Sequence, residues 1–368
     1  MSERYGRRVE AVRSRMRAAS LDGLLVTHPP NVSYLTGFTG DSSAVVLGID
    51  RLVIVSDFRY ETQLRDECPG QECHIRPSSK TLAQELGEVL AGIGWRSVGF
   101  ESASLSVLDW ETIRGGCGAV ELRSTAGVVE EVRAVKDDAE VADIRRAIDL
   151  AERVFERVRQ RWSGDWDEAA LANLMEAELR GLGAAGSAFP PIVAAGLRSA
   201  LPHARPESGV RLDSSDFTLI DWGACLGPLP YRSDLTRVVV TGKVSPRFEE
   251  IYGIVLEAQR RAIASIRPGI SAGEVDLQAR LFIQDAGFGR FFDHGLGHGI
   301  GLEIHEAPRL RKDAAEVLRP GMVLTIEPGI YLPDWGGIRI EDDVLVTPDG
   351  CECLSRLPRD LDRIQISR

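Results

Sequence analysis

Residues 323–346 read VLTIEPGIYLPDWGGIRIEDDVLV, a mixture of apolar runs and alternating polar residues that is typical of β-strands. Glu327 ends one expected strand and shares a face with Thr325, and Arg339 and Glu341 share a face of a later strand, because side chains repeat every two residues. Acids in such apolar strands are rarely buried unless they are paired or bind a metal ion. A salt bridge from Arg339 to one glutamate is the alternative, and it leaves the other acids unexplained.

A second acidic segment, residues 221–237, reads DWGACLGPLPYRSDLTR and indicates a β-hairpin. Asp221 ends an apolar run, Asp234 precedes a β-branched run, and Gly227 and Pro228 occupy the middle. The two carboxylates are then able to face each other on one side of the ribbon, where like charges cost energy unless a cation lies between them. From this segment alone, a metal pair and two unrelated acids, one ending a strand and one in a turn, remain equally open.

The third segment, residues 294–306, reads HGLGHGIGLEIHE. His294 and His298 would share one face of a helix, but the four interspersed glycines argue against a helix, since each costs roughly 1 kcal/mol relative to alanine. We therefore expect an extended segment. Glycine in a strand often marks a close approach to the backbone, and a metal ion or a substrate is the group we expect there.

The chain is organised as two domains, which we place at residues 1–132 and 133–368. Alternating apolar runs and helical stretches indicate an α/β first domain, and a boundary follows near Val135, where Asp137 and Glu140 have the spacing of a capping box. The first domain has expected strands at 23–27, 44–47 and 52–55 and an expected helix at 82–90.

The second domain shows the same order of elements twice, although no sequence repeat is visible. Each half has two helices followed by strands, and Ser271 and Glu274 form another capping box before a helix that Gly287 ends. The expected helices span 138–161 and 167–182, then 246–266 and 271–286. The expected strands lie around Ile192, Leu219 and Val238, then around Gly295, Val323 and Ile338.

Composition restricts the class of protein. The 368 residues are 43% hydrophobic and 27% charged, as in globular proteins, and no apolar stretch reaches the length of a membrane span. The formal charge of −11 and the absence of a basic stripe in the sequence disfavour nucleic acid as a partner. The charged start of the chain lacks the pattern of a secretory signal, and the six cysteines form no dense framework, so we expect a cytoplasmic protein with reduced thiols.

These segments together resemble metallopeptidase family M24, most closely its Xaa-Pro aminopeptidase and prolidase branch. The resemblance covers nearly the whole chain. It implies an α+β protein in which a creatinase-like α/β amino-terminal domain precedes a pita-bread catalytic domain. Besides the segments above, it rests on NVSYLTGFTG (31–40), SDFRYETQ (56–63) and FPPIVAAGLRSALPHARP (189–206).

The resemblance also implies roles for individual residues, namely five ligands of two divalent metal ions, three histidines around the substrate, and one arginine that supports the site. The ligands are Asp221, Asp234, His298, Glu327 and Glu341, the histidines are His203, His294 and His305, and the arginine is Arg339. The stretch from Asp221 to Asp234 is two residues longer than the usual family hairpin. Two added residues preserve strand parity, so we expect both aspartates to remain metal ligands, while the shape of the turn and any substrate contact that it makes stay open.

Four carboxylates and one imidazole suit manganese, cobalt, iron or zinc, and we expect two manganese ions, with cobalt or zinc as alternatives. The hypothesis is hydrolysis by a metal-activated water, with Glu327 carrying the proton and His305 or His203 stabilising the oxyanion. By resemblance we expect a homodimeric Xaa-Pro aminopeptidase acting on peptides. An Xaa-Pro dipeptidase is the nearest alternative. A metal-free creatinase-like hydrolase and a non-catalytic protein-binding module are disfavoured because all five ligands are intact.

Overall fold

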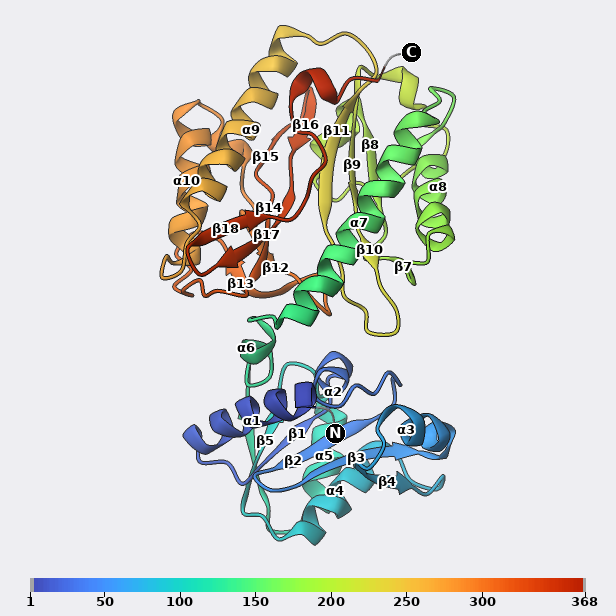
Figure 1. The fold of residues 1–368 in the computed structure, drawn as a ribbon, viewed down its shortest axis with the longest axis vertical. Coiled ribbons are helices and arrows are strands. Elements are labelled where there is room, and N and C mark those ends of the chain that lie inside the picture. Colours follow the sequence, from blue (N-terminus) through green and yellow to red (C-terminus); the bar gives the residue numbers. More distant parts are fainter. Residues whose placement is uncertain (1–2, 367–368) are drawn as a thin grey trace. The chain divides into compact units, whose positions relative to one another are not determined.

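The computed structural model describes residues 3–366. The chain divides into two compact units, the first ending at Arg133 and the second beginning at Ala134. Each unit has its own sheets and its own helices (Figure 1). No helix within residues 3–366 combines the length and the apolar character needed to cross a lipid bilayer.

The first unit is built on a six-stranded mixed sheet with the order β4-β3-β2-β1-β5-β6. The strands β1, β2 and β3 pair antiparallel, while β4, β5 and β6 each join parallel to a neighbour. The strands are β1 (Gly23–Val26), β2 (Ala44–Gly48), β3 (Leu52–Asp57), β4 (Glu72–Arg76), β5 (Ser97–Glu101) and β6 (Glu121–Thr125). The helices are α1 (Glu3–Ala18), α2 (Pro29–Thr36), α3 (Glu61–Glu67), α4 (Leu82–Ile93), α5 (Val107–Gly116) and α6 (Glu130–Arg133).

The three strands and the helix that the sequence predicts for this unit are confirmed as β1, β2, β3 and α4. Helix α4 begins at a capping box formed by Thr81 and Gln84, which satisfies amide groups that a helix start leaves without partners. Its buried residues Leu86 and Leu90 belong to the same apolar cluster as Leu25 and Val53 of the sheet. The burial of these side chains attaches the helix to the sheet.

The first half of the second unit consists of two helices and an antiparallel sheet. Asp137 and Glu140 form the predicted capping box, and the apolar stripe of the long helix that follows is buried. Phe155 of this stripe stacks on Trp222 with ring centroids 4.8 Å apart. The elements are α7 (Asp138–Gln160), α8 (Glu168–Gly181), β7 (Gly186–Ser187), β8 (Ile192–Ala195), β9 (Phe217–Trp222), β10 (Ala224–Cys225) and β11 (Leu235–Val240).

The second half repeats this order, two helices and then strands. The capping box of Ser271 and Glu274 is present, and Gly287 has the left-handed conformation expected of a helix stop. The helices are α9 (Pro246–Ser265) and α10 (Ala272–Asp285). The strands are β12 (Gly297–Gly299), β13 (Glu306–Leu310), β14 (Val323–Ile326), β15 (Gly329–Leu332), β16 (Gly336–Arg339), β17 (Asp342–Thr347) and β18 (Gly350–Cys353).

The strands of the second unit lie between the two pairs of helices (Figure 1). One sheet has the order β11-β9-β8 and another the order β13-β12-β14-β17-β18. A bridge between Thr236 and Glu341 joins the two halves. The predicted strand around Gly295 begins two residues later, at Gly297.

Candidate metal centre

A pocket of about 630 Å³ opens in the second unit. All nine site residues named from the sequence line it, although they come from six separate segments of the chain. They are His203, Asp221, Asp234, His294, His298, His305, Glu327, Arg339 and Glu341.

The two aspartates lie on one face of the predicted hairpin. Strand β9 pairs antiparallel with β11, and Asp221 lies opposite Thr236. Asp234 precedes Thr236 by two residues and therefore points to the same side. Their carboxyl groups contact each other. The two carboxylates therefore share one side of the hairpin despite its two additional residues.

His298 lies on the short strand β12, which confirms the extended conformation of its segment. Its Nδ1 donates to the carbonyl of Gly299 at 3.1 Å, so its Nε2 carries a free lone pair, as metal-binding histidines do. Its backbone N–H donates to Thr325 Oγ1 at 3.0 Å.

The glycines beside His298 have a different role from the one we expected. A Cβ atom on Gly297 would lie 1.9 Å from the carbonyl oxygen of Thr325, and one on Gly299 would lie 2.1 Å from that of Ala307. The groups that approach this segment closely are therefore the backbones of the neighbouring strands. The prediction that a metal ion or a substrate is the approaching group is wrong at these two positions.

The two glutamates reach the pocket from adjacent parts of the second half. Glu327 follows β14, and its Oε1 accepts a hydrogen bond from Thr325 Oγ1 at 3.3 Å. Glu341 precedes β17, and its Oε2 accepts one from Thr236 Oγ1 at 2.6 Å. Each carboxylate is thus oriented by a threonine from a strand beside it.

Three of the nine residues converge most closely. Potential ligand atoms of Asp234, His298 and Glu341 all lie within 4.8 Å of one another. Glu327 Oε1 is 3.4 Å from His298 Nε2, which places it beside this group. Asp221 turns one oxygen toward Arg339, and its Oδ1 is buried without a hydrogen-bond partner in the described part of the chain. A buried carboxylate oxygen without a partner is costly, which makes it available to a cation.

The electrostatics of the pocket favour added positive charge. Burial and the neighbouring carboxylates raise the pKa of Asp234 well above its ordinary value. Burial likewise raises the pKa of Glu341 well above its ordinary value, and that of Glu327 to about 7. Burial raises the pKa of Asp221, although the guanidinium of Arg339 opposes this rise. A cation would relieve the repulsion among these groups.

The pKa values of the imidazoles shift in the opposite direction. Burial lowers the pKa of His298 to about 3 and that of His294 to about 4. Both rings are therefore neutral near pH 7, which is the state in which a ring nitrogen binds a metal ion or accepts a hydrogen bond.

Arg339 connects several walls of the pocket. Its guanidinium donates to Asp221 Oδ2 at 2.6 Å, to Thr236 Oγ1 at 3.1 Å and to the hydroxyl of Tyr331 at 2.8 Å. Tyr331 also contacts His294 Nε2 at 3.1 Å. The salt bridge of Arg339 is thus made with an aspartate, whereas the alternative considered from the sequence paired it with a glutamate.

His305 and His203 occupy the exposed margin of the same pocket. The ring of His305 meets that of His298 edge to face, with centroids 4.4 Å apart. Burial and the positive charge of Arg309 lower the pKa of His305. The two rings are accessible to a molecule that enters the pocket.

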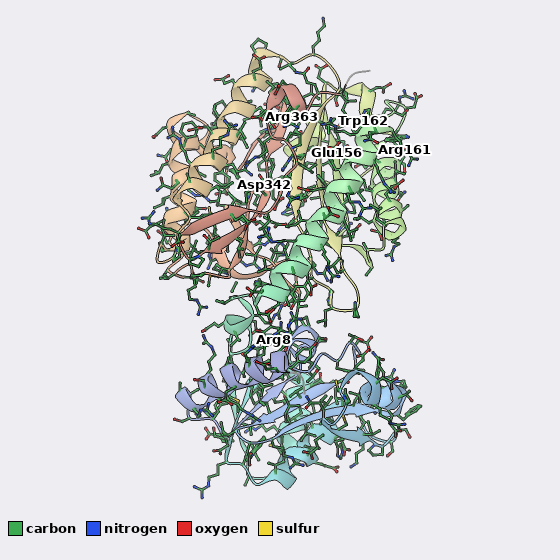
Figure 2. The ribbon with its side chains drawn as sticks, viewed as in Figure 1. Arg8, Glu156, Arg161, Trp162, Asp342 and Arg363 are labelled. Atoms are coloured by element: carbon green, nitrogen blue, oxygen red, sulfur yellow. The ribbon has the colours of Figure 1, made fainter. Side chains whose placement is uncertain are left out.

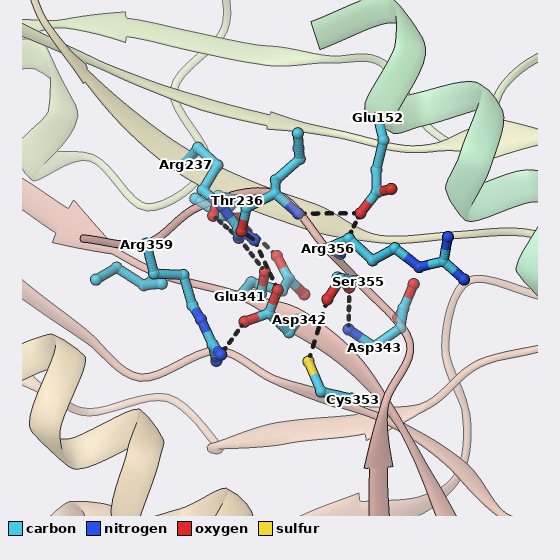
Figure 3. Close-up of polar contacts among 12 residues, drawn as sticks. Glu152, Thr236, Arg237, Glu341, Asp342, Asp343, Cys353, Ser355, Arg356 and Arg359 are labelled. Carbon is cyan, nitrogen blue, oxygen red and sulfur yellow. Dashed lines mark hydrogen bonds and ion pairs between the residues drawn. The ribbon is translucent and has the colours of Figure 1, made fainter. Parts of the chain in front are cut away.

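A buried ion pair between Arg237 and Asp342 supports the backbone of Glu341 (Figure 3). Arg237, which is fully buried, donates to the carbonyl oxygen of Glu341 at 2.6 Å and to Asp342 Oδ1 at 2.7 Å. Asp342 also accepts from Gln259 and Arg359, each at 3.0 Å. Figure 2 places Asp342 inside the second unit. The strand that presents Glu341 is therefore fixed by charge-assisted hydrogen bonds.

A second ion pair, between the buried Asp276 and the partly buried Arg280, supports His294. Asp276 and Arg280 of helix α10 form a bidentate ion pair. Arg280 donates to the carbonyl of His294 at 2.7 Å, and Asp276 accepts from the N–H of Leu296 at 3.1 Å. These contacts fix the segment that leads into β12.

Sequence reasoning missed Tyr331, Thr236 and the supporting ion pairs. Strand parity carries a signal for Tyr331, because Gly329 pairs with Arg339 across β15 and β16 and Tyr331 follows Gly329 by two residues. The partners of Arg237 lie on elements whose contact no local pattern predicts, whereas Asp276 and Arg280 are four residues apart on α10, a spacing that the sequence does show.

Comparison with known proteins identifies the family. Residues 142–348 match the model of metallopeptidase family M24, and residues 8–135 match that of the creatinase/prolidase N-terminal domain. An Xaa-Pro dipeptidase of Pyrococcus horikoshii is 37% identical over 342 residues, which cover 93% of this chain and 95% of that protein.

Solved structures extend the comparison. An Xaa-Pro dipeptidase from Bacillus anthracis is 36% identical, with a TM-score of 0.91 over 97% of this chain and 99% of that one. An X-Pro aminopeptidase from Thermotoga maritima is 34% identical, with a TM-score of 0.84 over 94% of this chain and 99% of that one. The expected α+β architecture, a creatinase-like domain followed by a pita-bread domain, is confirmed. The chain belongs to metallopeptidase family M24.

Proposed function

We propose that this metallopeptidase is an Xaa-Pro dipeptidase that uses two divalent metal ions. The observation that carries the proposal is the convergence of three buried carboxylates, the partly buried Glu327 and one neutral imidazole on a single pocket. Similarity to proteins named Xaa-Pro dipeptidase favours the dipeptide substrate. It replaces the aminopeptidase activity that we expected first.

The residues of the pocket fit divalent ions. Asp221, Asp234, His298, Glu327 and Glu341 offer oxygen and nitrogen donors of the kind that manganese, cobalt or zinc binds, and manganese is our first choice. Four negative charges balance two divalent ions. The buried Oδ1 of Asp221, which has no hydrogen-bond partner in the described part of the chain, is able to bind one of them. When bound, the ions supply Lewis-acid polarisation of the peptide carbonyl and activation of water.

The chain itself contributes a proton carrier and substrate contacts. Glu327, whose Oε1 lies 3.4 Å from His298 Nε2 among the proposed ligands, is placed to accept and return a proton at the reacting centre. His305 and His203 lie at the pocket margin, where a ring N–H is able to stabilise the oxyanion. His294, held by Tyr331, contacts the substrate beside them.

Positive charge in the pocket wall favours a substrate with a free carboxylate close to the cleaved bond. Arg205, Arg309 and Arg311 line the pocket, and none of them forms an ion pair with another residue in the part of the chain that the structure describes. A dipeptide carries its carboxylate one residue beyond the scissile carbonyl. A guanidinium is the side chain best shaped to pair with that group.

The test compares Ala-Pro, its amide, and the tripeptide Ala-Pro-Ala with metal-depleted protein to which manganese, cobalt or zinc is returned. A charge-assisted contact contributes about 1.5–3 kcal/mol, so the free dipeptide should exceed its amide by roughly 10- to 100-fold in kcat/KM. A tripeptide cleaved faster than the dipeptide would favour the aminopeptidase. Full turnover without metal would exclude a metal-dependent reaction.

Glu327→Ala tests the proton carrier. We expect no measurable turnover by the metal-loaded variant, and its metal content is measured to show that the other four ligands still hold the ions. Wild-type turnover by the metal-loaded variant would show that the proton is carried by another group.

A further inference from the structure

A buried ion pair lies behind the loop that carries His305. Lys136 Nζ is 3.0 Å from Glu306 Oε2, and the two side chains are only 1% and 6% exposed. The partners are 170 residues apart in sequence. Neither side chain lines the pocket.

Glu306 is the residue next to His305, and its carboxylate shapes the loop from Gly301 to Glu306. Glu306 Oε1 accepts a hydrogen bond from the N–H of Glu303 at 3.1 Å. A Cβ atom on Gly301 would lie 2.8 Å from Glu306 Oε2, so the backbone of the loop is folded closely around the carboxylate. A movement of Glu306 therefore moves the backbone that presents His305.

Lys136 is itself held at a fixed place. Its N–H donates to the carbonyl of Gly321 at 2.9 Å, and the next residue, Asp137, caps helix α7. Glu140 of that cap accepts a hydrogen bond from the hydroxyl of Tyr231 in the hairpin loop at 2.7 Å. The first turn of α7 thus holds both the hairpin and, through Lys136, the His305 loop.

Stability alone is a poor reason for such a pair, because well-packed apolar residues often replace a buried ion pair without loss. An ion pair does fix geometry, and a carboxylate without its cation would be drawn toward water. We propose that Lys136 is a positioning residue that, through Glu306, holds the imidazole of His305 at the pocket. This inference rests on the proposed function, in which His305 contacts the substrate.

The effect of removing Lys136 on the reaction should therefore depend on the presence of His305. Without Lys136 the carboxylate of Glu306 reorients and the loop shifts, so the His305 ring leaves its place 4.4 Å from the ring of His298. A shift of about 1 Å at a catalytic group is able to cost on the order of 100-fold in rate. The ligand His298 lies on β12, which pairs with β13 through Gly299 and Glu306, so metal content is measured beside kcat to show that this ligand has kept its place.

The experiment is a double-mutant cycle of Lys136→Met and His305→Ala in the metal-loaded protein, with kcat, KM and metal content measured on Ala-Pro. We expect Lys136→Met to lower kcat by roughly 10- to 100-fold with metal content unchanged. In the His305→Ala background, the same substitution should have no further effect. Lys243→Met, which removes an exposed lysine, is the matched control and should leave kcat unchanged.

The outcomes separate the two proposals. If both single variants lower kcat and their effects multiply in the double variant, Lys136 does not act through His305 and this inference is overturned. If His305→Ala alone leaves kcat unchanged, the role of His305 in the proposed function is wrong and the inference fails with it. If Lys136→Met does not fold, the pair Lys136→Met with Glu306→Gln leaves no unpaired charge, and full kcat in that variant would also overturn the inference.

Discussion

Replacing Arg237 with methionine removes the cation that supports Glu341 and leaves a buried carboxylate behind. Arg237 is fully buried and donates to the carbonyl of Glu341, to Asp342 Oδ1 and to the carbonyl of Leu357 at 2.6, 2.7 and 3.0 Å. Loss of one partner from a buried ion pair costs about 3–5 kcal/mol. Asp342 retains two other donors, both at 3.0 Å, so we expect a loss of about 3 kcal/mol, near the lower end of that range.

The assay is urea unfolding in a chelating buffer, with hydrogen exchange used to assign the transition of the second unit. Arg145→Met is the control, because its partner is Glu352 in a partly exposed pair, and such pairs contribute no more than about 1 kcal/mol. Arg237→Met combined with Asp342→Leu should recover stability relative to Arg237→Met alone, since no buried charge is left unpaired and Arg359, whose side chain is 29% exposed, is able to turn to water. Equal losses for Arg237→Met and Arg145→Met would refute the reasoning.

Two further predictions concern the pocket. Burial raises the pKa of Glu327 to about 7 from 4.5, so the folded metal-free protein binds its proton more tightly than the unfolded chain. Its contribution to stability is therefore full below pH 4.5 and is lost as the pH rises toward 7. The difference in unfolding free energy between wild type and Glu327→Gln should fall by up to about 1.4 kcal/mol per pH unit across that interval. A difference that does not change with pH in urea titrations would contradict this. Gly297→Ala places a Cβ atom 1.9 Å from the carbonyl of Thr325 and should destabilise the protein by about 3 kcal/mol. Gly253→Ala, in open space on α9, should instead stabilise it by up to about 1 kcal/mol, and similar melting temperatures for the two variants would refute the packing argument.

Local signals were sufficient to predict most elements of the fold. The capping box at Asp137 and the stop at Gly287 mark helix ends that the structure has within a residue or two. These signals depend on neighbours in sequence, and for that reason they are readable from it. The predicted strand around Gly295 starts two residues before the observed one. Glycine gives no apolar alternation that marks where a strand begins.

Site residues could be predicted from the sequence where strand parity or motif resemblance applied. They could not be predicted where the partner of a side chain depends on contacts between distant segments. Parity correctly placed Asp221 and Asp234 on one face despite the longer hairpin. The choice of Asp221 as the partner of Arg339 depends on two strands brought together by the fold. The ion pair of Lys136 and Glu306 has the same origin, since no periodicity links residues so distant in the chain.

The central claim is that five side chains hold two metal ions in the pocket of the second unit. Anomalous diffraction from crystals soaked in manganese tests it most directly. We predict two manganese peaks, both in contact with the set formed by Asp221, Asp234, His298, Glu327 and Glu341. A pocket without a peak, or peaks only at other carboxylates on the surface, would contradict it.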